Sequence, residues 1–268
     1  MEKIVKPGRL LFAVALMASG AEQLVCAHFR IAVRYIVPWF PDSWFLAYLL
    51  GIALLVAGLG IATNNRARLY AFLLGFLCLL CALIVWLPKN VVHPLAGPRT
   101  LLFETLAFSG SALTLTGVLP AEKWFRGRWE SIINGLIKCG PSLFAVSLLI
   151  FGLDHFLFLD NVASLVPTWI PGSGVAWAIV TGLVFIFAGV NIATGWMSRW
   201  GSLALATMFL LWFFVLHLPG SVRASLSPIP ETPNRWSSAF IALGMCAGGL
   251  ISAWHAMCSQ ARTAKRTA

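Results

Sequence analysis

Residues 44–63 read WFLAYLLGIALLVAGLGIAT, a run of 20 residues without a charged side chain. A transmembrane α-helix needs about 20 mostly apolar residues, so this run predicts one membrane crossing. Residues 175–194, VAWAIVTGLVFIFAGVNIAT, form a second such run, whose final IAT triplet lies 131 positions after that of the first. The chain contains eight runs of this kind, at about 10–28, 44–63, 69–87, 100–119, 142–159, 175–194, 200–218 and 237–257.

The composition of the whole chain supports this interpretation. Of the 268 residues, 59% are apolar and only 10% are charged, and the mean hydropathy is +0.86. Soluble domains carry about a quarter of charged residues, so a soluble enzyme is excluded. Six Cys are too few for a disulfide scaffold, and the 12 Trp and 19 Phe demand burial. We predict an all-α integral membrane protein with eight transmembrane helices.

The distribution of basic residues predicts the orientation. Eight crossings place both termini on one side, and the segments on that side hold 13 of the 19 Lys and Arg residues. Because cytoplasmic loops are enriched in Lys and Arg, we expect both termini in the cytoplasm. The net charge of +10 is spread over short loops that meet anionic lipid, so we expect the bilayer as a partner and no nucleic acid. The first run resembles a secretory signal, but we expect it to be retained because an internal repeat requires it.

This internal repeat extends well beyond the two opening stretches. Each copy contains four apolar runs, an even number, so both copies enter the membrane in the same sense and form a parallel repeat. We divide the chain into a first four-helix unit, 1–119, a cytoplasmic interfacial linker, 120–141, and a second four-helix unit, 142–268. The matched positions include Leu87-Pro88 with Leu218-Pro219, Gly51 with Gly182, and Gly58 with Gly189.

Several short motifs make the chain resemble the DoxX-like family of four-helix membrane proteins, here as two tandem units. The second half is the better match by these motifs. The resemblance implies a small bacterial membrane protein, hence the bacterial cytoplasmic membrane, from a family in which some members are associated with quinone-linked oxidation of sulfur compounds or with redox-stress complexes. The motifs are FGLDH at 151–155, VPTWIP at 166–171, HLP at 217–219, GAEQ at 20–23, VPWFP at 37–41 and LP at 87–88.

Seven Asp, Glu and His residues fall inside the predicted membrane spans, and of these we expect His28 and His255, near helix ends, to be interfacial. Such residues are costly in a bilayer unless they are paired, and each of the other five is therefore a candidate for ligand binding. Counting about 1.5 Å per helical residue places them toward the outer face. The candidates are Glu22, Glu104, Asp154, His155 and His217.

Two interpretations of the polar set in the second unit stay open. Asp154, His155 and His217 lie on neighbouring helices, and the first unit lacks both histidines. In one interpretation the histidines exchange protons or hydrogen bonds with a quinone headgroup, because imidazole titrates near neutrality and offers a donor and an acceptor. In the other, each histidine only bridges helices.

Other cofactors find less support in the sequence. A metal site would need further ligands at a tight spacing that the chain does not offer. Haem held by His155 and His217 would need the two residues at one depth, but their estimated depths differ by roughly 7 Å. Cys78 and Cys81 form a CxxC pair in the middle of a predicted span, where we expect small apolar core residues rather than a redox pair.

These observations support two hypotheses about function. The first is a redox-associated accessory subunit that binds a quinone-like hydrophobic ligand near the outer face. Because the sequence has no Rossmann, haem-attachment or iron–sulfur motif, this hypothesis requires a redox partner protein. The second is a non-catalytic membrane protein for binding, assembly or transport. The sequence does not decide whether a reaction is catalysed.

Overall fold

The computed structural model describes residues 2–26, 44–92, 96–121, 127–226 and 235–267, and no strand occurs among them. Seven helices are long and apolar enough to cross a membrane, and a shorter apolar helix segment covers Ala47–Thr63. The predicted all-α membrane class is confirmed, and each of the eight predicted runs overlaps a helix. The elements are α1 (Glu2–Cys26), α3 (Trp44–Thr63), α4 (Ala67–Cys81), η1 (Ala82–Trp86), α5 (Leu87–Val92), α6 (Ala96–Val118), α7 (Glu130–Leu157), α8 (Leu159–Ser164), α9 (Gly174–Thr194), α10 (Ser198–Trp212), η3 (Phe213–His217), α11 (Leu218–Ser225) and α12 (Arg235–Thr267).

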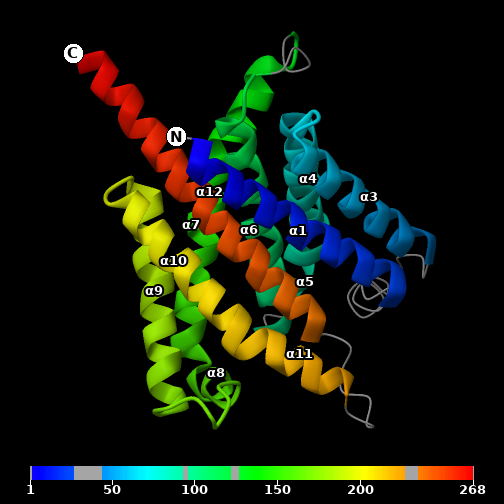
Figure 1. Ribbon diagram of the computed structural model, residues 1–268, viewed down its shortest axis with the longest axis vertical. Coiled ribbons are helices and arrows are strands. Elements are labelled where there is room, and N and C mark those ends of the chain that lie inside the picture. Colours follow the sequence, from blue (N-terminus) through cyan, green and yellow to red (C-terminus); the bar gives the residue numbers. More distant parts are fainter. Residues whose placement is uncertain (1, 27–43, 93–95, 122–126, 227–234, 268) are drawn as a thin grey trace.

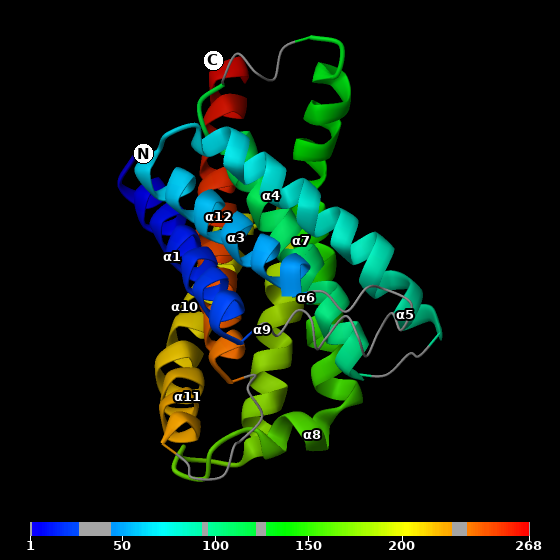
Figure 2. The same cartoon turned by 90° about the vertical axis from the view of Figure 1, so that its right-hand side faces the viewer.

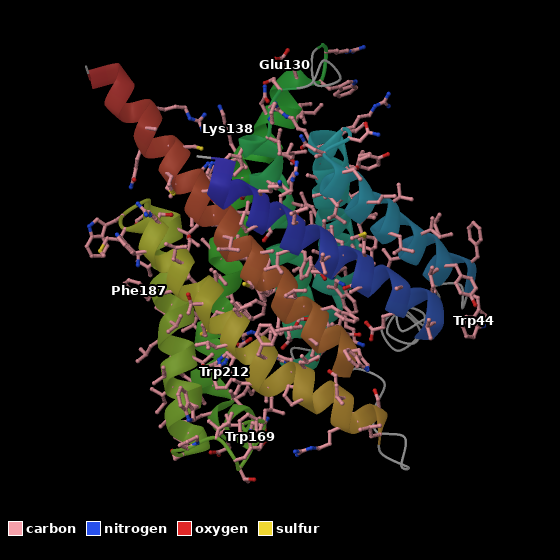
Figure 3. The ribbon with its side chains drawn as sticks, viewed as in Figure 1. Trp44, Glu130, Lys138, Trp169, Phe187 and Trp212 are labelled. Carbon is pink, nitrogen blue, oxygen red and sulfur yellow. The ribbon has the colours of Figure 1, made fainter. Side chains whose placement is uncertain are left out.

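Both ends of the chain lie at the same end of the helix bundle. Figures 1 and 2 show the beginning of α1 and the end of α12 there, with α8 and α11 at the opposite end. Figure 3 places Lys138 toward the end that holds the termini and Trp169 at the opposite end. This arrangement is the one that an even number of crossings requires. We call these two regions the terminal end and the opposite end.

Helices α7 and α12 extend well beyond their apolar runs. Helix α7 begins at Glu130, so it includes the second part of the predicted linker 120–141, and α12 continues to Thr267. A run of apolar residues identifies only the part of a helix that lies in lipid. It does not identify the polar turns by which the helix continues beyond the lipid. Residues 27–43, which contain the VPWFP motif, lie outside the described residues.

The runs 69–87 and 200–218 were predicted to stop at their Leu-Pro pairs, but the helices continue through the prolines. Helix α5 extends to Val92 and α11 to Ser225. A proline removes the hydrogen bond to the carbonyl four residues earlier. In both places a π-helical segment, η1 or η3, directly precedes the Leu-Pro pair, and its wider turn accommodates the missing bond without ending the helix.

The reversals between α3 and α4 and between α9 and α10 use the same backbone conformation. Asn64 and Arg66 have positive φ angles of 62° and 52°, and Gly195 and Met197 have φ angles of 75° and 48°. The two pairs are 131 positions apart. In each turn only three residues connect antiparallel helices, and the left-handed conformation allows so sharp a reversal.

The buried core is divided into two main clusters that share helices across the halves. One cluster joins residues of α1, α3, α4 and α6 to Ala247 and Ile251 of α12. The other joins residues of α7, α9, α10 and α12 to Ala107 of α6. Helices α6 and α12 therefore each contribute to both clusters, and the halves do not pack as two independent bundles.

Small residues allow these close crossings. Gly244 of α12 faces the ring of Phe108 on α6, and Gly248 faces Ser111. On the other side of α6, Gly110 lies against the backbone of Phe144 in α7. Because no side chain separates the helices there, α6 can touch α7 and α12 at once.

Candidate functional site

A large apolar cavity lies between α3, α4, η1 and α6, with a volume of about 490 Å³. Aliphatic side chains of these helices form most of its wall, and Ile241 of α12 contributes from the other half. Because α6 begins at the opposite end, Glu104 lies about two turns inside it. The cavity is thus in the half of the bundle away from the termini.

Glu104 is the one carboxyl group that lines this cavity in the described part of the chain. Within the described part of the chain, its side chain makes no hydrogen bond and no ion pair. The neighbouring hydroxyl of Thr105 does not serve it, because Thr105 Oγ1 donates to the Leu101 carbonyl over 2.7 Å. Glu104 is therefore a polar group in apolar surroundings with its bonding capacity unused.

Cys78 and Cys81 also line the cavity, and both are free thiols. The indole of the buried Trp86 donates a hydrogen bond to the Cys81 sulfur. The sequence predicted small core residues at these two positions. Both pack against clusters of the buried core, and they also form part of the cavity wall.

At the corresponding place in the second half, large rings stand where the first half has the two cysteines. Phe209 and Trp212 lie 131 positions after Cys78 and Cys81. The ring of Phe209 packs edge-on against Phe185 at 5.5 Å, and that of Trp212 packs against Trp177 at 5.7 Å. The halves therefore differ here in side-chain size: the first half has two cysteines where the second half has a phenylalanine and a tryptophan.

Asp154 of α7 is paired with Arg99 at the beginning of α6. The Arg99 Nη2 and Asp154 Oδ1 atoms are 2.7 Å apart, and the two side chains are 26% and 13% exposed. The pair links the last turns of α7 to the first turn of α6. From the sequence, Arg99 is one of the basic residues assigned to the loops on the side away from the termini. Its depth in the fourth helix matches that of Asp154 on the next helix, and this match could have predicted the ion pair.

His155 points away from Asp154, as expected for adjacent residues on a helix. Its Nδ1 atom lies 2.8 Å from the Phe151 carbonyl oxygen, and its ring lies 5.1 Å from that of Phe185 on α9. His217 is the last residue of η3, and its backbone carbonyl accepts a bond from Ser221. In the described residues no hydrogen bond, ion pair or ring contact joins Asp154, His155 and His217 to one another.

Glu22 of α1 accepts a hydrogen bond of 2.7 Å from the Ser237 hydroxyl on α12. This contact resembles the Asp154–Arg99 pair, because in both cases an acid on the first helix of one half meets the fourth helix of the other half. Neither acid lines the cavity. Among the described residues, no three His, Cys, Asp or Glu side chains gather closely enough to hold a metal ion.

These features define a polytopic α-helical membrane protein with an apolar cavity that one carboxyl group lines. Residues 4–87 match the model of the DoxX family, so the first half of the chain is similar to that family of membrane proteins. Residues 144–254 match the model of a domain of unknown function, DUF8561. No curated protein and no solved structure matches the chain.

The DoxX resemblance stated from the motifs is thus confirmed, but the match falls on the first half, whereas the motifs favoured the second. The matched residues include α1, α3, α4 and η1. Three of these elements form the cavity wall, and α6 adds Glu104 to it.

Proposed function

We propose that the protein binds a quinone-like ligand in the Glu104 cavity and serves as an accessory subunit of a membrane redox system. The observation behind this proposal is an unpartnered carboxyl group in an apolar cavity of about 490 Å³. Small-molecule sites are typically clefts of about 300–1,000 Å³ with apolar walls and a few polar groups that fix the ligand's orientation. The cavity meets this description.

The chemistry of the cavity suits a ring with carbonyl oxygens. An ionised carboxylate without a nearby cation is very costly in an apolar medium. Glu104 is therefore expected to be neutral when a ligand is bound, and a neutral carboxyl donates an O–H bond. A quinone carbonyl accepts such a bond, while the aliphatic wall accommodates the ring and the start of an isoprenoid tail. We assign any electron transfer to a partner protein.

We also infer that residues 1–119 and 142–268 are copies of one four-helix unit. Recurring packing supports this inference. A Cβ atom at Gly20 would lie 2.8 Å from the Gly51 carbonyl oxygen, and one at Gly152 would lie 3.0 Å from the Gly182 carbonyl oxygen. We place the protein in the bacterial cytoplasmic membrane with both termini in the cytoplasm, so that the cavity lies in the outer half of the bilayer.

The test is mass spectrometry of quinones that stay with the protein after gentle extraction into lipid nanodiscs. We expect stoichiometric quinone with the wild-type protein. Glu104→Leu removes the donor, and loss of one hydrogen bond should lower quinone retention by up to about tenfold. Glu104→Gln keeps an N–H donor and should retain more quinone than Glu104→Leu.

A second pair of variants tests the cavity itself. Cys78→Phe introduces the side chain that the second half holds at the corresponding position, and it should exclude the ligand while the helices still pack. Cys139→Phe is the matched control, because Cys139 is exposed on α7. A protein that carries no quinone, or equal retention by all variants, would contradict the proposal. A tightly bound partner protein without quinone would favour a non-catalytic role in assembly.

A further inference from the structure

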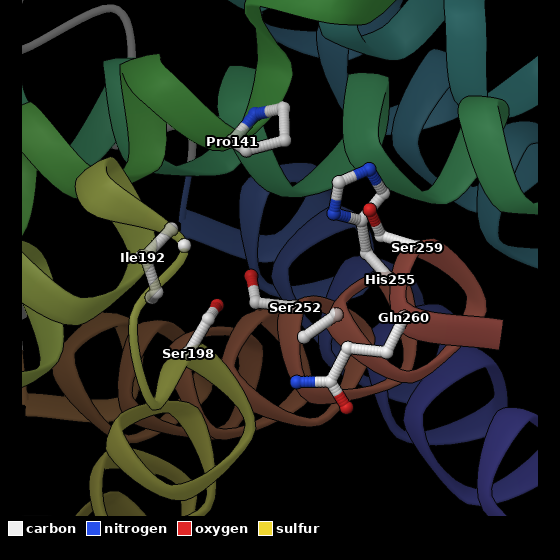
Figure 4. Close-up of a pocket in the computed structure, with 9 residues that line it drawn as sticks. Pro141, Ile192, Ser198, Ser252, His255, Ser259 and Gln260 are labelled. Atoms are coloured by element: carbon white, nitrogen blue, oxygen red, sulfur yellow. The ribbon is translucent and has the colours of Figure 1, made fainter. Parts of the chain in front are cut away.

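A second, smaller cavity lies near the terminal end, between α7, the turn from α9 to α10, and α12. Its volume is about 110 Å³. In contrast to the Glu104 cavity, much of its wall is polar, and Figure 4 shows the side chains of Ser198, Ser252 and His255 around it. Nothing in the proposed function uses this site.

The strongest feature of this cavity is a buried hydroxyl without a partner. Ser252 is only 2% exposed, its Oγ atom has no hydrogen-bond partner, and it lines the cavity. A buried polar group that stays unbonded costs about 1–3 kcal/mol. A polar ligand that forms a hydrogen bond with the Ser252 hydroxyl would remove this cost.

The neighbouring groups are hydrogen-bond donors. Ser198 is the first residue of α10, and it is 8% exposed. The amides of Trp200 and Gly201 bond the Met197 carbonyl, so the amides of Ser198 and Arg199 are the first-turn donors that an α-helix leaves without partners. The N-terminus of a helix also carries a partial positive charge.

The charges around the cavity favour an anion. Among the described residues, no Asp or Glu lines it. Arg199 follows Ser198 directly, and its Nε atom is buried without a partner. Lys138 lies one turn before the lining residue Pro141. A negative group in the cavity would therefore meet hydroxyl and amide donors and a surrounding positive field.

The described residues at the corresponding place in the first half are larger, and their polar groups are already bonded. In the first half, Arg9 donates a hydrogen bond to the Asn64 side chain at this place. In the second half, Pro141 stands at the position of Arg9 and Gly195 at that of Asn64, and both are much smaller residues. Gly8 of α1 faces Leu250 of α12 as Gly140 of α7 faces Thr114 of α6, so positions of α6 and α12 correspond at an offset of 136. By this offset Thr116 corresponds to Ser252, and its hydroxyl is already bonded to the Ala112 carbonyl over 2.9 Å. In the second half, the side chains at this place are therefore smaller, and the Ser252 hydroxyl has no hydrogen-bond partner.

We propose that this cavity binds a phosphate group. A phosphate has several acceptor oxygens and a negative charge, which match the donors of Ser198, Ser252 and the first turn of α10. Its source is either the headgroup of an anionic phospholipid or free phosphate. The position near the end of the membrane-spanning segments allows a lipid headgroup to reach it.

Native mass spectrometry from nanodiscs of phosphatidylcholine with one fifth phosphatidylglycerol, roughly the charge density of an anionic leaflet, tests the lipid source. We expect the wild-type protein to retain phosphatidylglycerol in excess. Ser252→Ala should weaken this retention about tenfold, since a hydrogen bond to a charged group is lost. Thr116→Ala is the matched control and should retain the lipid normally.

A second variant protects the test against a folding defect. Ser198→Ala combined with His255→Leu introduces the residues that the first half holds, Ala67 and Leu119, so it should fold and still lose retention. Titration with inorganic phosphate in neutral detergent tests the free source, with stabilisation of the wild type but not of Ser252→Ala as the expected result. Binding of neither probe, or equal binding by all variants, would overturn the proposal.

Discussion

Replacing Gly110 by alanine is expected to weaken the packing of α6 against α7. A Cβ atom at this position would lie 2.5 Å from the Phe144 backbone nitrogen and 2.7 Å from the Gly140 carbonyl oxygen, whereas ordinary contact begins at 3.4 Å. Both neighbours are backbone atoms of a helix, so no side chain can rotate away. Helix α7 must therefore move outward by about 1 Å.

The size of the effect follows from two opposing contributions. A gap of this width forfeits a quarter to a half of the dispersion energy between facing atoms, and overpacked substitutions cost about 1–3 kcal/mol. Alanine recovers about 0.8–1 kcal/mol because it favours the helix more than glycine does. Because the blocking atoms belong to a helix backbone, we place the cost near the upper end, about 2–3 kcal/mol, so the free energy of unfolding should fall by about 1–2 kcal/mol.

Reversible unfolding by SDS in mixed micelles, followed by circular dichroism, measures this change. The matched control is Gly135→Ala in α7, where an added Cβ meets no atom within 4 Å. The control should gain up to about 1 kcal/mol from helix propensity alone. A Gly110→Ala protein as stable as the wild type or more stable would refute the argument that α6 and α7 are in backbone contact.

Three further predictions address the ion pair, a histidine and the topology. A double-mutant cycle with Arg99→Leu and Asp154→Leu should give a coupling energy of about 1–2 kcal/mol in SDS unfolding, and additivity within about 0.5 kcal/mol would refute the pairing. His155→Phe should leave quinone retention in nanodiscs unchanged, because the His155 imidazole bonds its own helix; a loss of quinone would return the site to the second half. Reporter fusions at Lys89 and Ala268 should report opposite sides of the membrane, and identical signals would contradict the predicted topology.

Apolar runs alone determined the class of the protein. A stretch such as 44–63 has to form a helix in lipid, because no water is available to bond its backbone. The same rule fails at the ends of helices, where water satisfies the backbone. Helix α7 therefore begins at Glu130, well before the apolar run at 142. It also fails at Pro88, where the preceding π-helical segment lets the helix continue.

The sequence also identified Glu104 and Asp154 as candidates, because a charge in a bilayer is costly wherever it lies. It could not show that Asp154 has Arg99 as its partner and Glu104 has none, since pairing depends on which helices touch and at what height. Nor could it show that Cys78, besides packing against the core, borders a cavity. A small side chain leaves a cavity only if the neighbouring helices do not move together to fill the space. Whether they do depends on how α3, α4 and α6 pack.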